Sequence, residues 1–243
     1  MTRYSLHGGH NSIVQGANCG SRKEHIMDRQ VKDAVAAKLR ALGHTVYDDT
    51  DEMGSTQARN LSNIVANCNS HTVDLVISFH LNAFNGTANG VEVCYYDQQG
   101  LATKVSGQLS KDIGWKDRGA IERKELYVLA HTEAPAILIE LGFIDNDNDM
   151  AKWDVDKIAN SIVYALTGQS VGTNDESKYI VTGGLRLQAC YEISQYLLER
   201  NWWGKMEFTT NGDAFVTTGG IYEPQLSEFR TWMDQKGWYY EVR

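Results

Sequence analysis

Residues 73–80 read VDLVISFH and residues 136–140 read AILIE, and these two apolar runs decide the fold. Both runs are short, rich in β-branched residues and continuously hydrophobic, which is typical of strands buried on both faces of a sheet. The first run ends at His80 and the second at Glu140. Because ligands bind outside the carboxyl ends of strands in open α/β sheets, we expect these two side chains to converge.

Segments of strand and helix character alternate around these two runs. We predict strands at residues 2–6, 44–47, 73–79, 90–96, 126–129 and 136–141. Apolar residues recur at helical spacing around residues 31–42, 58–68, 105–113 and 158–166. Repeated strand and helix units predict an α/β fold in which helices cover both faces of one sheet.

A polar stretch without periodicity at residues 169–177 is the best linker candidate, so we predict domains at 1–168 and 178–243. The second domain contains an internal duplication, because YIVTGG at 179–184 matches FVTTGG at 215–220 at an offset of 36. The same offset pairs Tyr196 with Trp232. Each copy has the pattern strand, helix, strand, which predicts a small α+β domain with a four-stranded sheet packed on two helices.

Composition excludes several classes of protein. The formal net charge of −8 and the lack of a basic run argue against nucleic-acid binding, which depends on neutralising phosphates. The four cysteines are far apart, so we expect free thiols.

Residues 1–30 hold no apolar signal core and no later stretch could span a bilayer. We therefore expect synthesis in the cytoplasm, and export by another agent if the target lies outside the membrane.

Four residues form a candidate catalytic constellation. His10 follows the first strand, Glu24 opens the first long helix, and His80 and Glu140 end the two buried strands. Two imidazoles and one carboxylate form a common catalytic zinc set with a fourth position open to water or substrate. Glu140 is then free to take a proton from attacking water and pass it to a departing amine.

Simpler interpretations of the same residues remain open at this point. Glu24 could be an acidic first-turn residue favoured by the helix dipole. His80 could be a core histidine satisfied by backbone groups, and Glu140 could pair with a nearby arginine.

The residues around the constellation resemble a known family. GGHN at 8–11, KEH at 23–25, SFHLNA at 78–83 and IELGF at 139–143 are similar, in order and separation, to zinc-dependent N-acetylmuramoyl-L-alanine amidases, in particular the catalytic domains of bacteriophage endolysins. The resemblance covers about residues 2–167. It implies that His10, Glu24 and His80 bind Zn²⁺ and that Glu140 is the catalytic acid or base. It also implies a twisted, mostly parallel sheet of about six strands.

Two further histidines stay open. The family has Asp three residues before the first ligand, where this chain has His7. His7 is therefore a substitute ligand or a partner of the ligands, with His10 preferred because Asn11 follows it in the expected register. His131, after LYVL at 126–129, is either a surface residue or a groove residue that touches substrate.

The second domain is rich in aromatic residues. It holds 13 of the 24 aromatic residues in 66 positions. Sugars stack on aromatic faces, which favours a wall-binding role, and the duplicated pattern is similar to SPOR-like peptidoglycan-binding domains. Because so small a domain needs aromatic residues for its core, we expect about two-thirds of these rings to be buried.

These observations predict a peptidoglycan hydrolase that cleaves the amide bond between N-acetylmuramic acid and L-alanine. The four motifs and the missing signal core favour a phage endolysin or a closely related bacterial autolysin. We expect it to be made in the cytoplasm of a bacterial host and to reach the cell wall through a pore formed by a partner holin. Two alternatives stay open: a metallopeptidase that cuts the stem peptide, and a non-catalytic peptidoglycan-binding protein.

Overall fold

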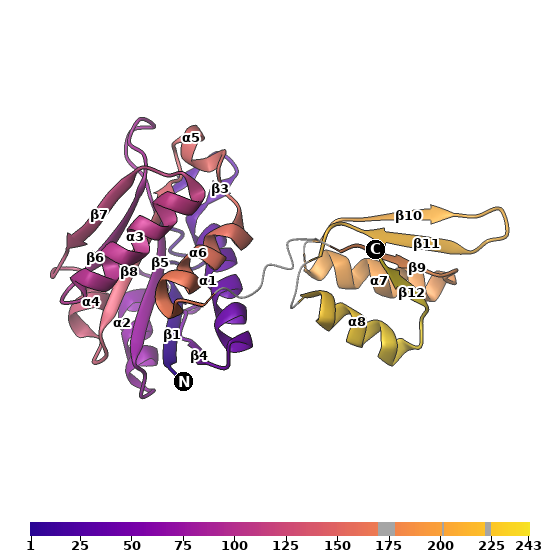
Figure 1. Cartoon of the computed structure of the whole chain (residues 1–243), viewed down its shortest axis with the longest axis horizontal. Coiled ribbons are helices and arrows are strands. Elements are labelled where there is room, and N and C mark those ends of the chain that lie inside the picture. The colour runs from indigo at the N-terminus through magenta and orange to yellow at the C-terminus, as the bar shows by residue number, and fades with distance from the viewer. Residues whose placement is uncertain (170–177, 201, 222–224) are drawn as a thin grey trace. The chain divides into compact units, whose positions relative to one another are not determined.

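The computed structural model describes residues 1–169, 178–200, 202–221 and 225–243. The chain divides into two compact units between Val171 and Gly172, and each is described by itself (Figure 1). Apart from Gln169, the predicted linker at 169–177 lies outside the described residues.

The N-terminal unit is built on one six-stranded sheet. Its strand order is β4-β1-β5-β8-β6-β7, and every neighbouring pair is parallel except β8 and β6. The predicted mostly parallel sheet is therefore confirmed. The strands are β1 (Arg3–Gly8), β4 (Thr45–Asp48), β5 (Leu75–Asn82), β6 (Val91–Tyr95), β7 (Asp117–Glu122) and β8 (Ala136–Phe143).

Helices cover both faces of this sheet, as predicted. The larger hydrophobic cluster joins one face to α1, α3 and α6, and a smaller cluster joins the other face to α2 and α4. Along β5, Ile77 faces the larger cluster and Val76 the smaller one, which explains why the strand is apolar at successive positions. The helices are α1 (Glu24–Ala41), α2 (Gln57–Asn69), α3 (Gln99–Ile113), α4 (Tyr127–His131), α5 (Asp147–Met150) and α6 (Val155–Thr167).

The strand predicted at residues 126–129 is wrong, because residues 127–129 belong to helix α4 and Leu126 is its N-cap. Val128 and Leu129 are buried against the cluster that contains α2, and a short apolar run fits a buried helix turn as well as a strand. The sixth strand is instead β7, DRGAIE, at the edge of the sheet. No position of β7 is fully buried, so its sequence carries no apolar run.

The C-terminal unit contains a four-stranded sheet in the order β10-β11-β9-β12, with all pairs antiparallel. Helices α7 and α8 lie on one face of it (Figure 1). This confirms the predicted sheet packed on two helices. The elements are β9 (Ile180–Thr182), α7 (Leu187–Glu199), β10 (Gly204–Phe208), β11 (Ala214–Thr218), α8 (Gln225–Lys236) and β12 (Tyr240–Val242).

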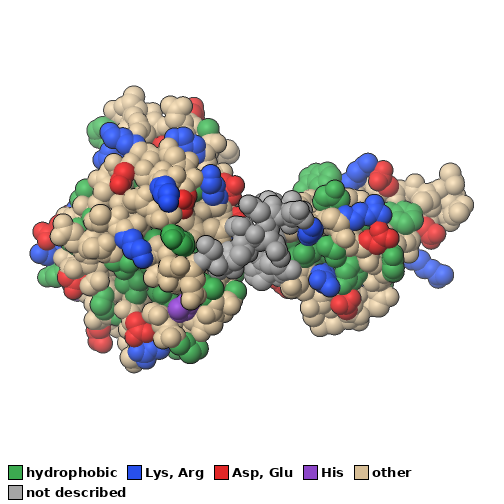
Figure 2. Space-filling model, in the orientation of Figure 1, with side chains coloured by type: hydrophobic (Ala, Val, Ile, Leu, Met, Phe, Trp, Pro, Cys, Tyr) green, Lys and Arg blue, Asp and Glu red, His purple; other side chains and the backbone are tan. Residues whose placement is uncertain are grey.

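The aromatic residues of this unit are less buried than predicted. Among the twelve whose placement is described, only Tyr196 and Phe229 are buried, five are partly buried and five are exposed. The expected two-thirds is therefore wrong. A two-layer unit buries only the surfaces between its sheet and its helices. The rings on its other surfaces stay exposed, and Figure 2 shows hydrophobic side chains on the visible face of this unit.

Candidate metal centre

The ends of β1 and β5 bring two of the candidate ligands together. These strands are neighbours in parallel register, with Gly8 beside Phe79, so the loop after β1 and the end of β5 lie at the same edge of the sheet. His10 lies in that loop and His80 lies near the end of β5. Glu24 is the first residue of α1. One potential ligand atom from each of these three residues lies within 4.8 Å of the other two.

Glu24 lies at the centre of this group. Its Oε1 atom is 3.0 Å from Nδ1 of His80 and 3.5 Å from Nε2 of His10. The amide of Leu81 donates to the same oxygen at 3.0 Å, and the amide of Ala17 donates to Oε2 at 2.6 Å. The backbone therefore fixes the carboxylate between the two imidazoles.

The loop between β1 and α1 can pack closely on the group because it contains glycines. A Cβ atom at Gly9 would overlap the His80 imidazole, and one at Gly16 would overlap Glu24 and His10. Gly16 also has φ +70°, which other residues rarely adopt. Asn11 holds the loop, because its Oδ1 accepts from the amides of Ile13 and Val14 at 2.9 and 2.7 Å.

Glu140 lies beside the group on the neighbouring strand. In the parallel pair β5 and β8 it stands opposite His80, and on its other side it stands opposite Glu92 of β6. Glu92 is already engaged by Arg118 and Asn82. Oε2 of Glu140, in contrast, is buried without a hydrogen-bond partner among the described residues. Burial, together with the charges of Glu24 and Glu92, raises the pKa of Glu140 to about 7, although His80 opposes the shift.

Charge around the group favours a cation. Burial lowers the pKa of His10 to about 4, with a further contribution from His80. Burial also acts to lower the pKa of His80, but the carboxylates of Glu24, Glu140 and Asp28 outweigh it and raise this pKa to about 9. These carboxylates thus stabilise positive charge at His80. With its two imidazoles and one carboxylate, the set fits a zinc ion.

The sequence did not single out Asp28. It lies one helical turn after Glu24 on α1 and is fully buried. Burial raises its pKa to about 7, and its Oδ2 atom has no hydrogen-bond partner among the described residues. The four-residue spacing from Glu24 places both carboxylates on one face of the helix. This spacing was the sequence feature that could have identified Asp28 as a neighbour of the site.

The two open histidines lie elsewhere. His7 is buried within β1, where burial lowers its pKa to about 3, and its Nδ1 atom is 3.5 Å from Oγ of Ser78. His131 is exposed at the end of α4 and stacks on Tyr127 with a ring separation of 4.1 Å. Neither belongs to the three-residue group found among the described residues.

An imidazole and carboxylate set at the carboxyl edge of a parallel sheet, next to a spare glutamate, is typical of metal-dependent hydrolases. Sequence comparison shows the family to which the chain belongs. Residues 6–168 match the model of the N-acetylmuramoyl-L-alanine amidase family, and the chain belongs to this family. Residues 199–242 match the PlyG cell wall binding domain.

Individual relatives agree with this assignment. The uncharacterized protein YqiI of Bacillus subtilis is 31% identical over 154 residues, which are 60% of this chain and 72% of that protein. The N-acetylmuramoyl-L-alanine amidase LytC of Bacillus subtilis is 28% identical over 59% of this chain and 30% of its own length. Several other relatives are longer, and the chain spans 17% to 57% of them.

The same fold occurs in a solved endolysin domain. The catalytic domain of the CD27L endolysin targeting Clostridia Difficile superposes with a TM-score of 0.64 at 29% identity, over 71% of this chain and all of that domain. The predicted amidase family and peptidoglycan substrate are thereby confirmed. A cell-wall-binding unit is confirmed too, although the matching family is that of PlyG and not the SPOR-like one. In the described part of the chain, no helix has the length and hydrophobicity needed to cross a membrane.

Proposed function

We propose that this chain is a zinc-dependent endolysin whose N-terminal unit hydrolyses the amide bond between N-acetylmuramic acid and L-alanine. One observation carries the proposal. Ligand atoms of His10, Glu24 and His80 lie within 4.8 Å of one another, and Glu140 stands opposite His80 on the next strand.

Nε2 of His10, Nδ1 of His80 and Oε1 of Glu24 would hold the metal ion, since both nitrogens lie within 3.5 Å of that oxygen. A zinc ion held by these atoms would supply a Lewis acid for the scissile carbonyl and for water. The amides of Leu81 and Ala17 keep the Glu24 carboxylate in place, so little reorganisation is needed for binding.

Glu140 is the proton carrier of the reaction. As water attacks the carbonyl carbon of the lactyl group, Glu140 accepts a proton from it. Glu140 then delivers this proton to the nitrogen of L-alanine as the carbon–nitrogen bond breaks. The products are the muramic acid carboxylate and a stem peptide with a free amino terminus. A carboxyl group that lies near both the attacking water and the departing nitrogen can accept one proton and then return it.

The two units divide the work between residues 1–168, which cleave, and residues 178–243, which bind the wall. The similarity to the CD27L catalytic domain and to the PlyG wall-binding domain supports an endolysin. We further propose synthesis in the host cytoplasm and release through a holin pore.

Digestion of purified peptidoglycan tests the activity. We expect new L-alanine amino termini and intact stem peptides, found by mass spectrometry, and loss of both products after treatment with a chelator. Cleavage inside the stem peptide would indicate a metallopeptidase. Binding without any cleavage would indicate a non-catalytic protein.

A further inference from the structure

The C-terminal unit shows its duplication in the contact between α7 and α8. Tyr196 of α7 and Trp232 of α8 are equivalent at the offset of 36, and their ring centroids lie 4.3 Å apart. Equivalent residues of two copies touch where the axis that relates the copies passes between them. An approximate twofold axis therefore runs through the seam between the two helices at this aromatic pair.

Two ion pairs across the seam obey the same symmetry. Arg200 of the first copy lies 3.0 Å from Glu228 of the second. The offset of 36 converts this pair into Lys236 and Glu192, which lie 2.7 Å apart. The same contact is thus made twice. One pair joins the end of α7 to the start of α8, and the other joins the end of α8 to the middle of α7.

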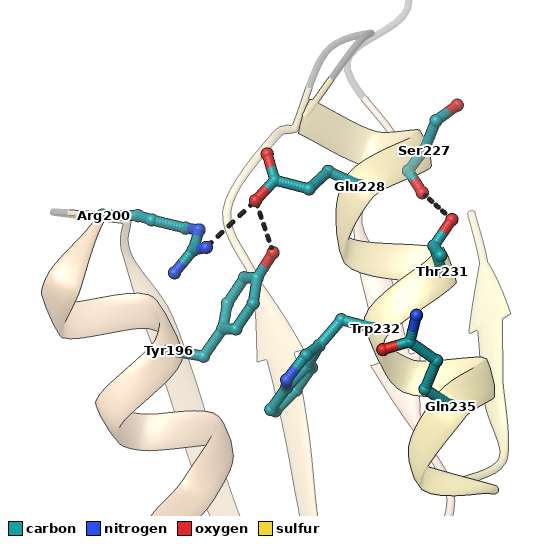
Figure 3. A pocket seen from close by; sticks show the side chains of 7 residues that line it. All are labelled: Tyr196, Arg200, Ser227, Glu228, Thr231, Trp232 and Gln235. Atoms are coloured by element: carbon teal, nitrogen blue, oxygen red, sulfur yellow. Dashed lines mark hydrogen bonds and ion pairs between the residues drawn. The ribbon is translucent and has the colours of Figure 1, made fainter.

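Each ion pair lines a groove. The first groove has a volume of about 420 Å³, and Figure 3 shows Tyr196 and Trp232 between the helices with the Arg200–Glu228 pair beside them. Ser227, Thr231 and Gln235 of α8 complete its wall.

The second groove has a volume of about 490 Å³. Its lining includes Gln188, Glu192, Lys236 and Trp238. Both volumes fall within the range of small-ligand sites, roughly 300–1,000 Å³.

The chemistry of the grooves fits a sugar. A pyranose ring presents an apolar face of C–H groups and an edge of hydroxyl groups. The first groove offers a partly buried indole at Trp232 together with the guanidinium of Arg200, the carboxylate of Glu228 and the amide of Gln235. The second groove offers similar groups with Trp238, Lys236, Glu192 and Gln188. By the offset of 36 only its ion pair is equivalent to that of the first groove, because Trp238 corresponds to Trp202.

Charge argues against a polymer rich in phosphate. The first groove pairs one cation with one anion, the second has Arg186 and Lys236 beside Glu192, and residues 178–243 contain seven basic and eight acidic side chains. A polyanion requires an excess of positive charge. The near balance of charge in this unit favours an uncharged saccharide.

We propose that the two grooves are related subsites for the sugar residues of one wall glycan, so that the face formed by α7 and α8 is the wall-binding surface of this unit. The proposal rests on the wall-binding role of the C-terminal unit and not on the amidase site. A repeating polymer can occupy both subsites, and the second contact then forms at a high effective concentration.

Paired substitutions at equivalent positions test the proposal. Arg200→Ala alters the first groove and Lys236→Ala the second, in the full chain carrying Glu140→Gln so that the walls stay intact. Arg243→Ala is the matched control, because it also removes a cation from an exposed ion pair, but on the strand β12 side with Glu241. Co-sedimentation with purified cell walls measures the affinity, on a wall type that retains the Glu140→Gln chain.

We expect about a tenfold loss of affinity for each groove variant, a larger loss for the double variant and no change for the control. Glycan strands freed of peptide should compete for binding, and free stem peptide should not. Unchanged binding of the double variant, an equal loss in the control, or competition by peptide alone would overturn the proposal. Thermal unfolding verifies that each variant is folded.

The amidase proposal is tested independently of the groove proposal. Cleavage of a soluble muropeptide by the chain with native Glu140 does not require wall attachment. If the Glu140→Gln chain bound to none of the wall types tested, both the groove proposal and the wall-binding role would be overturned. The result of the muropeptide cleavage assay would not be affected.

Discussion

The two units assemble polar side chains in opposite ways. In the N-terminal unit, His10, Glu24, His80 and Glu140 come from remote segments and meet in a partly buried group held by backbone amides. In the C-terminal unit, the polar groups come from two copies of one motif and lie on an open helix surface. The first arrangement suits chemistry, in which one displaced atom abolishes the reaction. The second suits adhesion, in which each contact is weak and repetition provides affinity.

Among substitutions that test this difference between the units, we expect the largest loss of activity at Glu140. Glu140→Gln keeps the shape of the side chain but removes the proton carrier, so we expect kcat to fall roughly 10²–10⁴-fold. The assay is the release of L-alanine amino termini from a soluble muropeptide. Glu122→Gln, on the edge strand β7, is the control and should retain most of the activity, because Glu122 is exposed and pairs with Lys124. Equal losses in both variants would contradict the assigned role.

A glycine pair tests whether close packing builds the metal centre. Gly16 and Gly114 both have positive φ, but a Cβ at Gly16 would overlap Glu24, whereas one at Gly114 meets no atom within 4 Å. Gly16→Ala should therefore lose zinc and activity. Gly114→Ala should keep both and lose only about 1 kcal/mol of stability to backbone strain. Zinc content after purification and thermal unfolding provide the readouts, and normal zinc content in Gly16→Ala would refute the packing argument.

Acid should affect the two units differently. All seven histidines lie in residues 1–131, and burial lowers the pKa of His7 from 6.5 to about 3. A lowered folded-state pKa gives stability that is present above about pH 6.5 and is lost as the pH falls toward 3. Between pH 6.5 and 5, His7 should cost the N-terminal unit about 2 kcal/mol.

Chemical denaturation at both pH values, with chelator present, measures this loss. His7→Gln should reduce the pH dependence of the N-terminal transition and leave the C-terminal transition unchanged. An unaltered pH dependence would show that His7 is not buried in its neutral form.

The smallest effect is expected from the ion pairs of the helix seam. Arg200→Ala and Lys236→Ala remove exposed pairs, which typically contribute about 0.2–1 kcal/mol. Each variant should therefore unfold within a few degrees of the unmodified chain. A loss of several kcal/mol in the free energy of unfolding would mean that the ion pairs hold the two helices together. The C-terminal surface would then have a structural role besides adhesion.

Sequence reasoning located the candidate centre because its residues follow strong local signals. His80 and Glu140 end continuous apolar runs, and Glu24 begins a regular helix. It could not locate the amides of Ala17 and Leu81, because every residue has an amide and only the tertiary structure selects these two. It also assigned residues 126–129 to a strand, since four apolar residues fit either a strand or a helix turn.

The duplication was visible in the sequence, but its consequence was not. An offset of 36 shows which residues are equivalent, whereas only the structure shows that Tyr196 touches Trp232 and that the ion pairs cross between copies. The burial of the aromatic rings was overestimated for a related reason. Composition does not tell which rings lie between the layers of a small unit and which face outward.

Anomalous diffraction at the zinc edge, from crystals grown with zinc, tests the central claim most directly. The account predicts one peak within about 2.0–2.2 Å of Nε2 of His10, Nδ1 of His80 and a carboxylate oxygen of Glu24. The absence of a peak there, or a peak bound by other residues, would contradict it.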